Sequence, residues 1–260
     1  MTQKNSFVKN LKGAVLLLRP HHWIKNGFVL VPAFFGGQAH NTPLMLQALG
    51  AAFLFCLVSS LIYVFNDLRD VEADRLHAKK KLRPLASGMV SSTTALVLMV
   101  ALVGGMAALI WALQPGRDFL AVLGLYIALN LAYSLGLKQL ALAEIFLVSS
   151  GYILRLIAGA MIVNETLTHW IIACTGLVSL LLTVGKRRGD MVQNNDVNNS
   201  RRSLATYSIP YLDHVMTMLA ACTIVTYLLF TMSDYAHKRF GEYVMLSAVF
   251  VLFGIMRYLQ

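Results

Sequence analysis

Charged residues are scarce in this chain of 260 residues. Asp, Glu, Lys and Arg together make up 13% of it, whereas hydrophobic residues make up 57%. One water-soluble core could not bury so large an apolar fraction, so the composition excludes an ordinary soluble domain. It predicts an all-α fold, a polytopic bundle of transmembrane helices. We expect a single domain over residues 1–260.

Cysteine is equally rare. Cys56, Cys174 and Cys222 lie far apart inside apolar runs and lack the spacing of metal ligands. They are interpreted as small hydrophobic residues, which excludes a disulfide framework and a zinc site. A cleavable signal peptide is also not visible, because the first apolar stretch, residues 14–18, is short and runs into an Arg-Pro pair. The first transmembrane segment is therefore expected to belong to the mature protein.

Acidic residues are outnumbered, with 12 Asp and Glu against 22 Lys and Arg, for a net charge of +10. Such a balance can indicate nucleic-acid binding, but the positions of the cations argue against it. They fall between apolar segments near the roughly 20 residues that a membrane span requires. Eight such segments can be placed, at about 24–37, 43–65, 91–113, 119–135, 141–162, 166–185, 211–233 and 242–259.

Most Lys and Arg residues lie in the N-terminal arm and in the loops after the second, fourth and sixth segments. By the positive-inside rule, these loops are cytoplasmic. The protein is thus expected in the plasma or inner membrane, without nucleic acid as a partner. Two of these loops, at about 67–91 and 186–208, are too long for simple connections and are expected to cap an active site that faces the cytoplasm.

The first long loop begins with a cluster of acids. On a continuing helix, Asn66, Asp70 and Asp74 are spaced four residues apart, and Asp67 precedes Asp74 by seven, so all four share one face. Oxygen ligands without His or Cys suit a hard ion such as Mg²⁺, which takes its remaining ligands from water and phosphate. The alternative is a solvated helix end whose acids pair with neighbouring Arg and Lys.

Cations follow the acids. Residues 79–81 are all Lys, and Arg83 precedes a proline. These side chains could bind phosphate, or the Lys run could serve only to orient the protein in the membrane.

Other polar residues occur inside apolar segments. Arg155 lies in the middle of the fifth segment, and Glu144 precedes it by about three helical turns, on the same face. Asn130, Tyr133 and Ser134 form a polar stripe on the fourth segment. Both features could be structural, the Arg bonded to helix carbonyls and the stripe joining helices. Together they predict a polar cavity that opens toward the cytoplasm.

These motifs carry a family resemblance. The segment from Asn66 to Asp74, with His77, Lys80, Arg83-Pro84 and Gly88, resembles the first signature of the UbiA superfamily of intramembrane prenyltransferases. Further elements resemble its decaprenyl-phosphate phosphoribosyltransferase branch, namely Arg19-Pro20 with Trp23, Lys25 and Asn26; Tyr133-Ser134 with Leu137-Lys138; Ser149 to Gly159; and Gly185-Lys186-Arg187.

The resemblance implies a Mg²⁺-dependent transfer of 5-phosphoribose from phosphoribosyl pyrophosphate to a polyprenyl phosphate, for cell-envelope arabinose or ribose precursors. Aromatic prenyltransferases of the superfamily carry a second Asp-rich motif, whereas this chain has Lys186-Arg187-Arg188-Gly189-Asp190 there, and Asn194 beyond. Fewer acids and more cations suit two phosphorylated substrates. The expected partners are these two substrates and membrane lipids, and assembly into a homo-oligomer is left open.

The resemblance also implies roles for single residues. Mg²⁺ would be held by Asp67, Asp70 and Asp74, with Asn66 nearby, and these acids would be catalytic. The phosphates would be clamped by Lys80, Arg83, Lys186 and Arg187. The candidates to bind the rest of the substrates or steer the lipid head group are Lys25, Tyr133, Lys138 and Arg155.

The chain departs from the family pattern in two ways. Ala78 stands where the family usually has proline, which should alter loop rigidity without removing a ligand. The resemblance implies nine helices, whereas eight segments are counted here, so a ninth lies beyond Gln260 or short segments are miscounted. Two alternative functions remain, a Mg²⁺-dependent prenyltransferase with an aromatic acceptor, and a non-catalytic membrane transporter or scaffold.

Overall fold

A computed structural model describes residues 12–76, 80–193 and 206–260, and all the regular secondary structure in these residues is helical. Short 3-10 helices are η1 (Pro20–Val29), η2 (Gln38–His40), η3 (Lys80–Leu82), η4 (Leu137–Gln139) and η7 (Glu242–Leu246). The α-helices are α2 (Val31–Phe35), α3 (Thr42–Arg69), α4 (Val71–Leu76), α5 (Ser92–Leu113), α6 (Arg117–Leu135), α7 (Ala143–Val163), α8 (His169–Gln193), α9 (Ile209–Thr231), α10 (Asp234–Phe240) and α11 (Ser247–Leu259).

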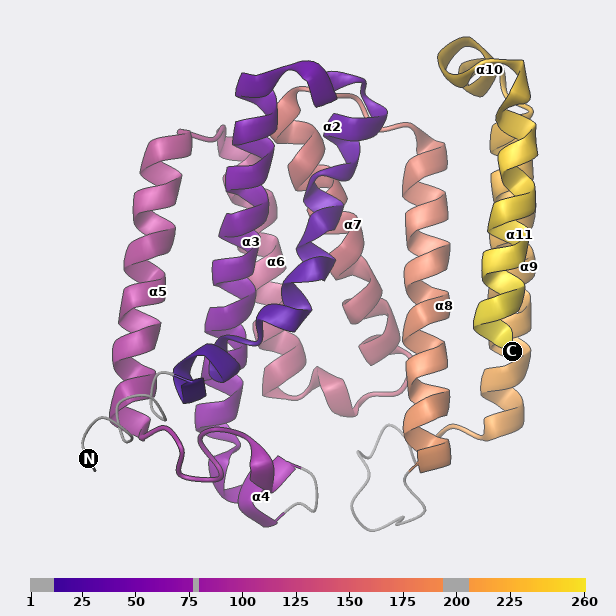
Figure 1. Cartoon of the computed structure of the whole chain (residues 1–260). Coiled ribbons are helices and arrows are strands. Elements are labelled where there is room, and N and C mark those ends of the chain that lie inside the picture. Colours follow the sequence, from indigo (N-terminus) through magenta and orange to yellow (C-terminus); the bar gives the residue numbers. More distant parts are fainter. Residues whose placement is uncertain (1–11, 77–79, 194–205) are drawn as a thin grey trace. The chain divides into compact units, whose positions relative to one another are not determined.

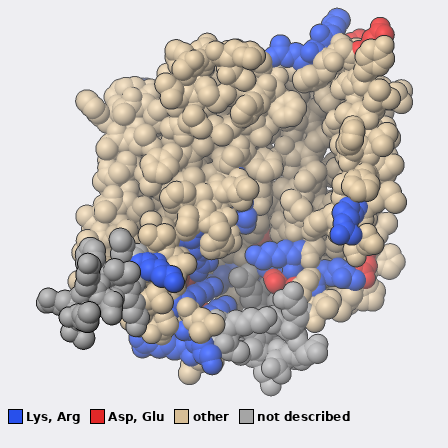
Figure 2. Space-filling model, in the orientation of Figure 1, with Lys and Arg blue, Asp and Glu red and all other residues tan. Residues whose placement is uncertain are grey.

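Seven helical segments of the described chain are long and apolar enough to cross a membrane: α3, α5, α6, α7, α8, α9 and the run from η7 through α11. They correspond to the second through eighth predicted spans. On the face shown in Figure 2, Lys, Arg, Asp and Glu gather mainly in the lower part of the view, and the middle of the view is mostly uncharged. Apolar side chains that face outward, such as Val97, Val100 and Trp111 of α5, are suited to lipid.

The first predicted span, at about 24–37, is wrong as a single helix. The segment is instead broken into η1 and α2, which are joined at Leu30. Pro20 and Pro32 each stand in the first turn of one of these helices, where the missing N–H is tolerated. Pro32 therefore starts a new helix and cannot continue the previous one.

The described chain divides into two compact units. Unit 1 comprises residues 1–134 and 154–166, and unit 2 comprises 135–153 and 167–260, so α7 contributes one half to each.

In unit 1, α3 is the central helix, and both η1 and α5 pack along it (Figure 1). Its buried side chains include Phe55 and Val58, which join Phe119 and Tyr126 of α6 in one apolar core. Gly159 of α7 faces η1 so closely that a Cβ atom there would overlap the carbonyl group of Val29. This contact requires glycine and brings two helices of unit 1 together.

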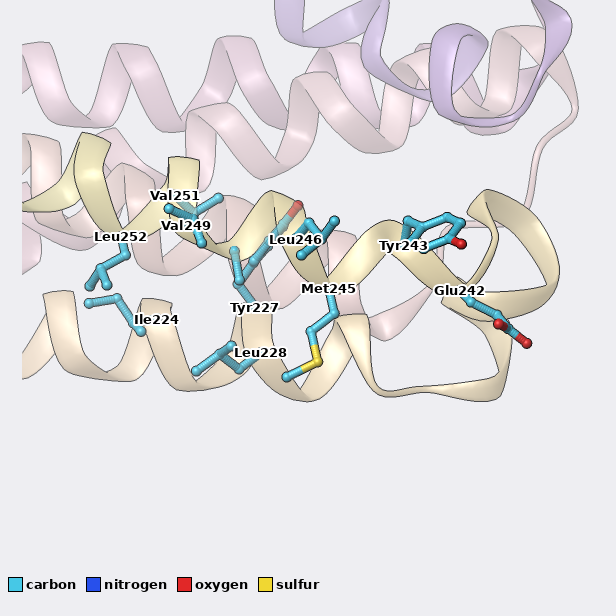
Figure 3. A pocket seen from close by; sticks show the side chains of 11 residues that line it. Ile224, Tyr227, Leu228, Glu242, Tyr243, Met245, Leu246, Val249, Val251 and Leu252 are labelled. Atoms are coloured by element: carbon cyan, nitrogen blue, oxygen red, sulfur yellow. The ribbon is translucent and has the colours of Figure 1, made fainter.

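In unit 2, α8, α9 and α11 share an apolar core that includes Leu181, Leu212 and Ile255. The ribbons of α9 and α11 run side by side in Figure 1. An apolar groove of about 500 Å³ opens between α9 and the segment of η7 and α11, lined by residues such as Tyr227, Leu246 and Val249 (Figure 3).

The two predicted cap loops are partly helical. Residues 67–91 contain α4 and η3, and α8 continues to Gln193, beyond the expected start of the second loop at Lys186. No proline interrupts the stretch after Lys186, and Met191 and Val192 continue the helix. The predictions that concern His77, Ala78, Lys79 and Asn194 lie outside the described residues.

Candidate functional site

The acidic motif lies where α3 ends and α4 begins. Asp70 follows the last residue of α3 as its C-cap, with φ of −96° and ψ of 10°, so the expected continuous helix turns at this residue. The helical spacing is nevertheless kept, because the Asp70 N–H donates to the Asn66 carbonyl at 2.9 Å and the Asp74 N–H donates to the Asp70 carbonyl at 2.8 Å. Asp67 and Asp74 thus come from two helices, and both are buried, at 2% and 3% exposed.

One arginine nitrogen joins these two acids. Nη1 of Arg83 lies 3.0 Å from Oδ1 of Asp67 and 2.6 Å from Oδ2 of Asp74. Arg83 follows η3, so the loop after the motif folds back onto it. Arg83 was predicted to clamp phosphate, and its contacts in this structure are with the carboxylates of Asp67 and Asp74.

A second arginine approaches from the N-terminal side. Nη2 of Arg19 donates to both carboxylate oxygens of Asp67, at 2.7 and 3.0 Å, and its guanidinium lies over the ring of Tyr63. Arg19 has a left-handed backbone with φ of 53° and directly precedes η1. Trp23 fixes η1 to α3 by donating from Nε1 to Oγ of Ser60 at 3.0 Å. Arg19 was in the motif but not among the predicted site residues.

The third carboxylate stands apart. Oδ1 of Asp70 lies 3.1 Å from Nε of Arg69, and both side chains are about one-third exposed. Glu72, in the same motif, is exposed. The acids therefore do pair with arginines, as the alternative interpretation held, but Asp67 and Asp74 are buried and not solvated.

The candidate ligands for Mg²⁺ in this cluster are oxygen atoms of Asp67, Asp74 and Asn66. In residues 12–76, 80–193 and 206–260, no three His, Cys, Asp or Glu side chains are grouped as metal ligands. Mg²⁺ commonly uses only one or two carboxylates and completes its shell with water and phosphate. Asp67 and Asp74 supply such a pair around one cationic nitrogen, and Oδ1 of Asn66 is buried without a hydrogen-bond partner in the described chain. This donor set fits a hard divalent cation.

Arg155 lies inside unit 1, within a network of neutral groups. Its Nε donates to Oδ1 of Asn26 at 2.7 Å, and its Nη2 donates to Oη of Tyr126 at 2.6 Å. Asn26 in turn donates to Sγ of Cys56 at 3.2 Å. The guanidinium also lies over the Tyr126 ring, 4.7 Å from its centroid. Arg155 therefore joins η1, α3, α6 and α7.

The remaining predicted residues of unit 1 are half-buried. These are Lys25 in η1, Lys80 in η3 and Tyr133 in α6. Within the polar stripe on α6, Asn130 donates to the carbonyl of Tyr126 on its own helix at 2.8 Å. Ser134 is buried, and its Oγ has no hydrogen-bond partner in the described part of the chain.

Unit 2 holds its own charged cluster. Nη2 of Arg187 lies 3.1 Å from Oε2 of Glu144, and Nη1 lies 3.1 Å from Oδ2 of Asp190. Glu144 is fully buried and Arg187 is 4% exposed. The next residue, Arg188, pairs with Asp213. Of the basic run, Lys186 alone is exposed.

Lys138 and Tyr207 also belong to unit 2. Lys138 lies half-buried in η4, shortly before Glu144. Oη of Tyr207 accepts a hydrogen bond from the N–H of Leu142 at 2.6 Å. Burial raises the pKa of Tyr207 above its ordinary value, so the hydroxyl stays protonated at neutral pH.

Sequence reasoning therefore placed Asp67 and Asp74 on one face and named Arg83 separately as a phosphate ligand, but it missed Arg19 and the partners of Arg155. A signal for Arg19 existed, since it is a cation beside a proline at the start of an interrupted apolar segment. Glu144 was noted for its spacing from Arg155, whereas the structure pairs it with Arg187.

Comparison with known proteins identifies sequence relatives of this chain. Residues 28–260 match the model of the UbiA prenyltransferase family. The chain is 36% identical to the decaprenyl-phosphate phosphoribosyltransferase of Corynebacterium glutamicum, over 96% of this chain and 77% of that one. It is 34% identical to the protein of the same name from Mycobacterium tuberculosis, over 95% of this chain and 82% of that one.

Solved structures share the fold. A UbiA homolog from Archaeoglobus fulgidus bound to GPP and Mg²⁺ superimposes with a TM-score of 0.72 at 16% identity, over 95% of this chain and 86% of that one. Together with the helical spans, these matches establish a multi-pass integral membrane protein with transferase relatives. The chain belongs to the UbiA prenyltransferase family.

Proposed function

We propose that this transferase moves 5-phosphoribose from phosphoribosyl pyrophosphate to a polyprenyl phosphate and releases pyrophosphate. The observation that carries the proposal is the identity of 34–36% to decaprenyl-phosphate phosphoribosyltransferases over most of the chain. The likeness to prenyl diphosphate-bound structures, at 16% identity, concerns the fold alone. Both units are proposed to act as one catalytic domain in the cytoplasmic membrane, with the charged loops on the cytoplasmic side.

The acidic cluster of unit 1 is assigned to the diphosphate of the donor. Asp67 and Asp74, with the unpaired oxygen of Asn66, are the residues that would hold Mg²⁺, and Asp70 would contribute from its more exposed position. When bound, the ion supplies Lewis-acid neutralisation of the pyrophosphate leaving group. Arg19 holds Asp67 by both oxygens and so fixes the direction of that carboxylate.

In each unit, taken by itself, cations are assigned to phosphate. Arg83 retains N–H donors beyond those that its acids use, and Lys80 lies close before it in η3. In unit 2, Lys186 is the exposed cation, while Glu144 and Asp190 hold Arg187 in place. We assign direct phosphate contact to Lys186 and Arg83. Arg187 is assigned such contact only through N–H groups that it does not use for Glu144 and Asp190.

The reaction needs no strong base. The bond from the ribose anomeric carbon to the pyrophosphate oxygen breaks, and its electron pair leaves with pyrophosphate. A phosphate oxygen of the lipid, already an anion at neutral pH, forms the new bond to that carbon. Lys25, Tyr133 and Lys138 are candidates to steer the lipid head group, and Arg155 acts through Asn26 and Tyr126.

The proposal is tested with the full chain purified in detergent. Phosphoribosyl pyrophosphate labelled in the ribose is supplied with Mg²⁺ and polyprenyl phosphate, and organic-phase label is measured. A parallel reaction contains a labelled prenyl diphosphate and an aromatic acid. Label that enters the lipid in the first reaction alone supports phosphoribosyl transfer. Prenylation of the aromatic acid, with no ribose transfer, would refute the proposal in favour of the other chemistry.

A further inference from the structure

The guanidinium of Arg83 uses only one of its nitrogens. Nη1 contacts both Asp67 and Asp74, at 3.0 and 2.6 Å. Nε and Nη2 have no hydrogen-bond partner in residues 12–76, 80–193 and 206–260, and the side chain is 29% exposed. A guanidinium carries five N–H donors, so three of them remain available.

The position of Nη1 is set by electrostatics. Two buried carboxylates near one another repel and are costly to desolvate unless a cation lies between them. Arg19 neutralises Asp67 from one side, but Asp74 has Arg83 as its only ion-pair partner in the described chain. Arg83 therefore supplies the positive charge that these acids require.

A divalent cation bound by the same oxygens would take the place of Nη1. We propose that Arg83 is an exchangeable counterion, which neutralises Asp67 and Asp74 when no metal is bound. Once Mg²⁺ has displaced the guanidinium from these acids, all the N–H groups of Arg83 bind the diphosphate of phosphoribosyl pyrophosphate. The inference rests on the proposed function, because it takes these acids to be the metal ligands.

The exchange couples two binding events. Arg83 competes with the metal for the acids, so it weakens binding of the metal alone. It then contacts the phosphate only after the metal has displaced it, so it strengthens binding of the metal and pyrophosphate together. Such coupling is reciprocal, since each ligand changes the affinity of the other by the same factor.

Metal binding tests this without any transfer reaction. Mn²⁺ binding is measured by electron paramagnetic resonance, and binding of radiolabelled inorganic pyrophosphate in saturating Mn²⁺ by equilibrium dialysis. Arg83→Gln removes the counterion. Arg75→Gln is the matched control, because Arg75 is an exposed residue of α4 that forms no ion pair with the acids in the described part of the chain, and the charge change is the same.

Arg83→Gln is expected to bind Mn²⁺ alone about tenfold more tightly than the wild type, and Mn²⁺ with pyrophosphate about tenfold more weakly. Arg75→Gln should stay within about twofold of the wild type in both measurements. Weaker or unchanged binding of Mn²⁺ alone by Arg83→Gln, or an equal gain in Arg75→Gln, would overturn the inference.

Arg83→Lys provides a second test if the Arg83→Gln variant does not fold. Lysine retains the charge but lacks the planar fork, so Mn²⁺ alone should bind within about twofold of the wild type while pyrophosphate binding weakens. Unchanged pyrophosphate binding would contradict the exchange. Because pyrophosphate is the probe, a failure here is separate from a failure to transfer phosphoribose.

Discussion

Arg187 and Glu144 form an ion pair in the interior of unit 2, with Nη2 and Oε2 3.1 Å apart. Two helices, α7 and α8, are joined by this pair, and Asp190 contacts the same guanidinium one turn further along α8. Arg83 stands in a similar relation to Asp67 and Asp74 in unit 1. Each unit thus holds one arginine between two acids.

Removal of Glu144 should destabilise the protein. A buried pair that loses one partner typically costs about 3–5 kcal/mol, because the other charge is left in the interior. Glu144→Gln should therefore lower the thermal unfolding midpoint clearly, while Glu242→Gln, an exposed residue of η7, should change it little. Equal midpoints for both variants would contradict the role assigned to the pair.

The acids of unit 1 should be essential for activity. Asp67→Asn and Asp74→Asn are each expected to lower the transfer rate by at least about 100-fold, as loss of a metal ligand does. Glu72→Gln is the control, because Glu72 lies in the same motif but is exposed. Rates are measured by lipid labelling at saturating Mg²⁺. Near-normal rates for both Asn variants would rule out the metal assignment.

Asp70 is tested separately, because its carboxylate is 30% exposed and pairs with Arg69. Asp70→Ala should reduce transfer, with a higher Mg²⁺ requirement than the wild type. Full activity at limiting Mg²⁺ would remove Asp70 from the ligand set and leave Asp67 and Asp74.

The network around Arg155 predicts a positioning effect. Tyr126→Phe removes the acceptor of Arg155 Nη2 and leaves a buried charge less well satisfied, at a cost of about 1–3 kcal/mol. The thermal midpoint should fall, and Tyr235→Phe, at an exposed tyrosine, should leave it unchanged. A midpoint equal to the wild type in Tyr126→Phe would show that the network contributes nothing measurable.

Two glycines should respond oppositely to alanine. Gly159→Ala places a Cβ against the carbonyl of Val29 and should destabilise by about 1–3 kcal/mol, since backbone cannot move aside easily. Gly104→Ala enters open space in α5 and should stabilise by about 0.5–1 kcal/mol. Thermal midpoints that shift in the same direction would contradict this account of the contact between α7 and η1.

Much of the fold follows from hydrophobic segment length, because a helix that crosses lipid must be long and apolar. Seven predicted spans are confirmed in this way. The first predicted span was wrong, because Pro32 lies inside the apolar run and starts a new helix there. The length of an apolar run does not show whether the run forms one helix or two. The extension of α8 was missed because polar composition suggested a loop, whereas Met191 and Val192 continue the helix.

The candidate site was partly predictable. Helical spacing placed Asp67 and Asp74 together, because the hydrogen bonds of Asp70 and Asp74 preserve that spacing across the turn. The contact of Arg19 with Asp67, 48 residues apart in the chain, depends on tertiary packing that no local pattern encodes. Charge counting suggested that Arg187 was available for phosphate, but its burial with Glu144 required the structure.

The most direct test of the proposed function follows two labels in one reaction. Phosphoribosyl pyrophosphate carries ¹⁴C in the ribose and ³²P in the pyrophosphate, and the wild-type protein receives Mg²⁺ and polyprenyl phosphate. The account predicts that ¹⁴C enters the lipid while ³²P is released into the aqueous phase as pyrophosphate. EDTA should prevent both the labelling of the lipid and the release of pyrophosphate. Transfer of ³²P to the lipid, or no ¹⁴C in the lipid with folded protein, would contradict it.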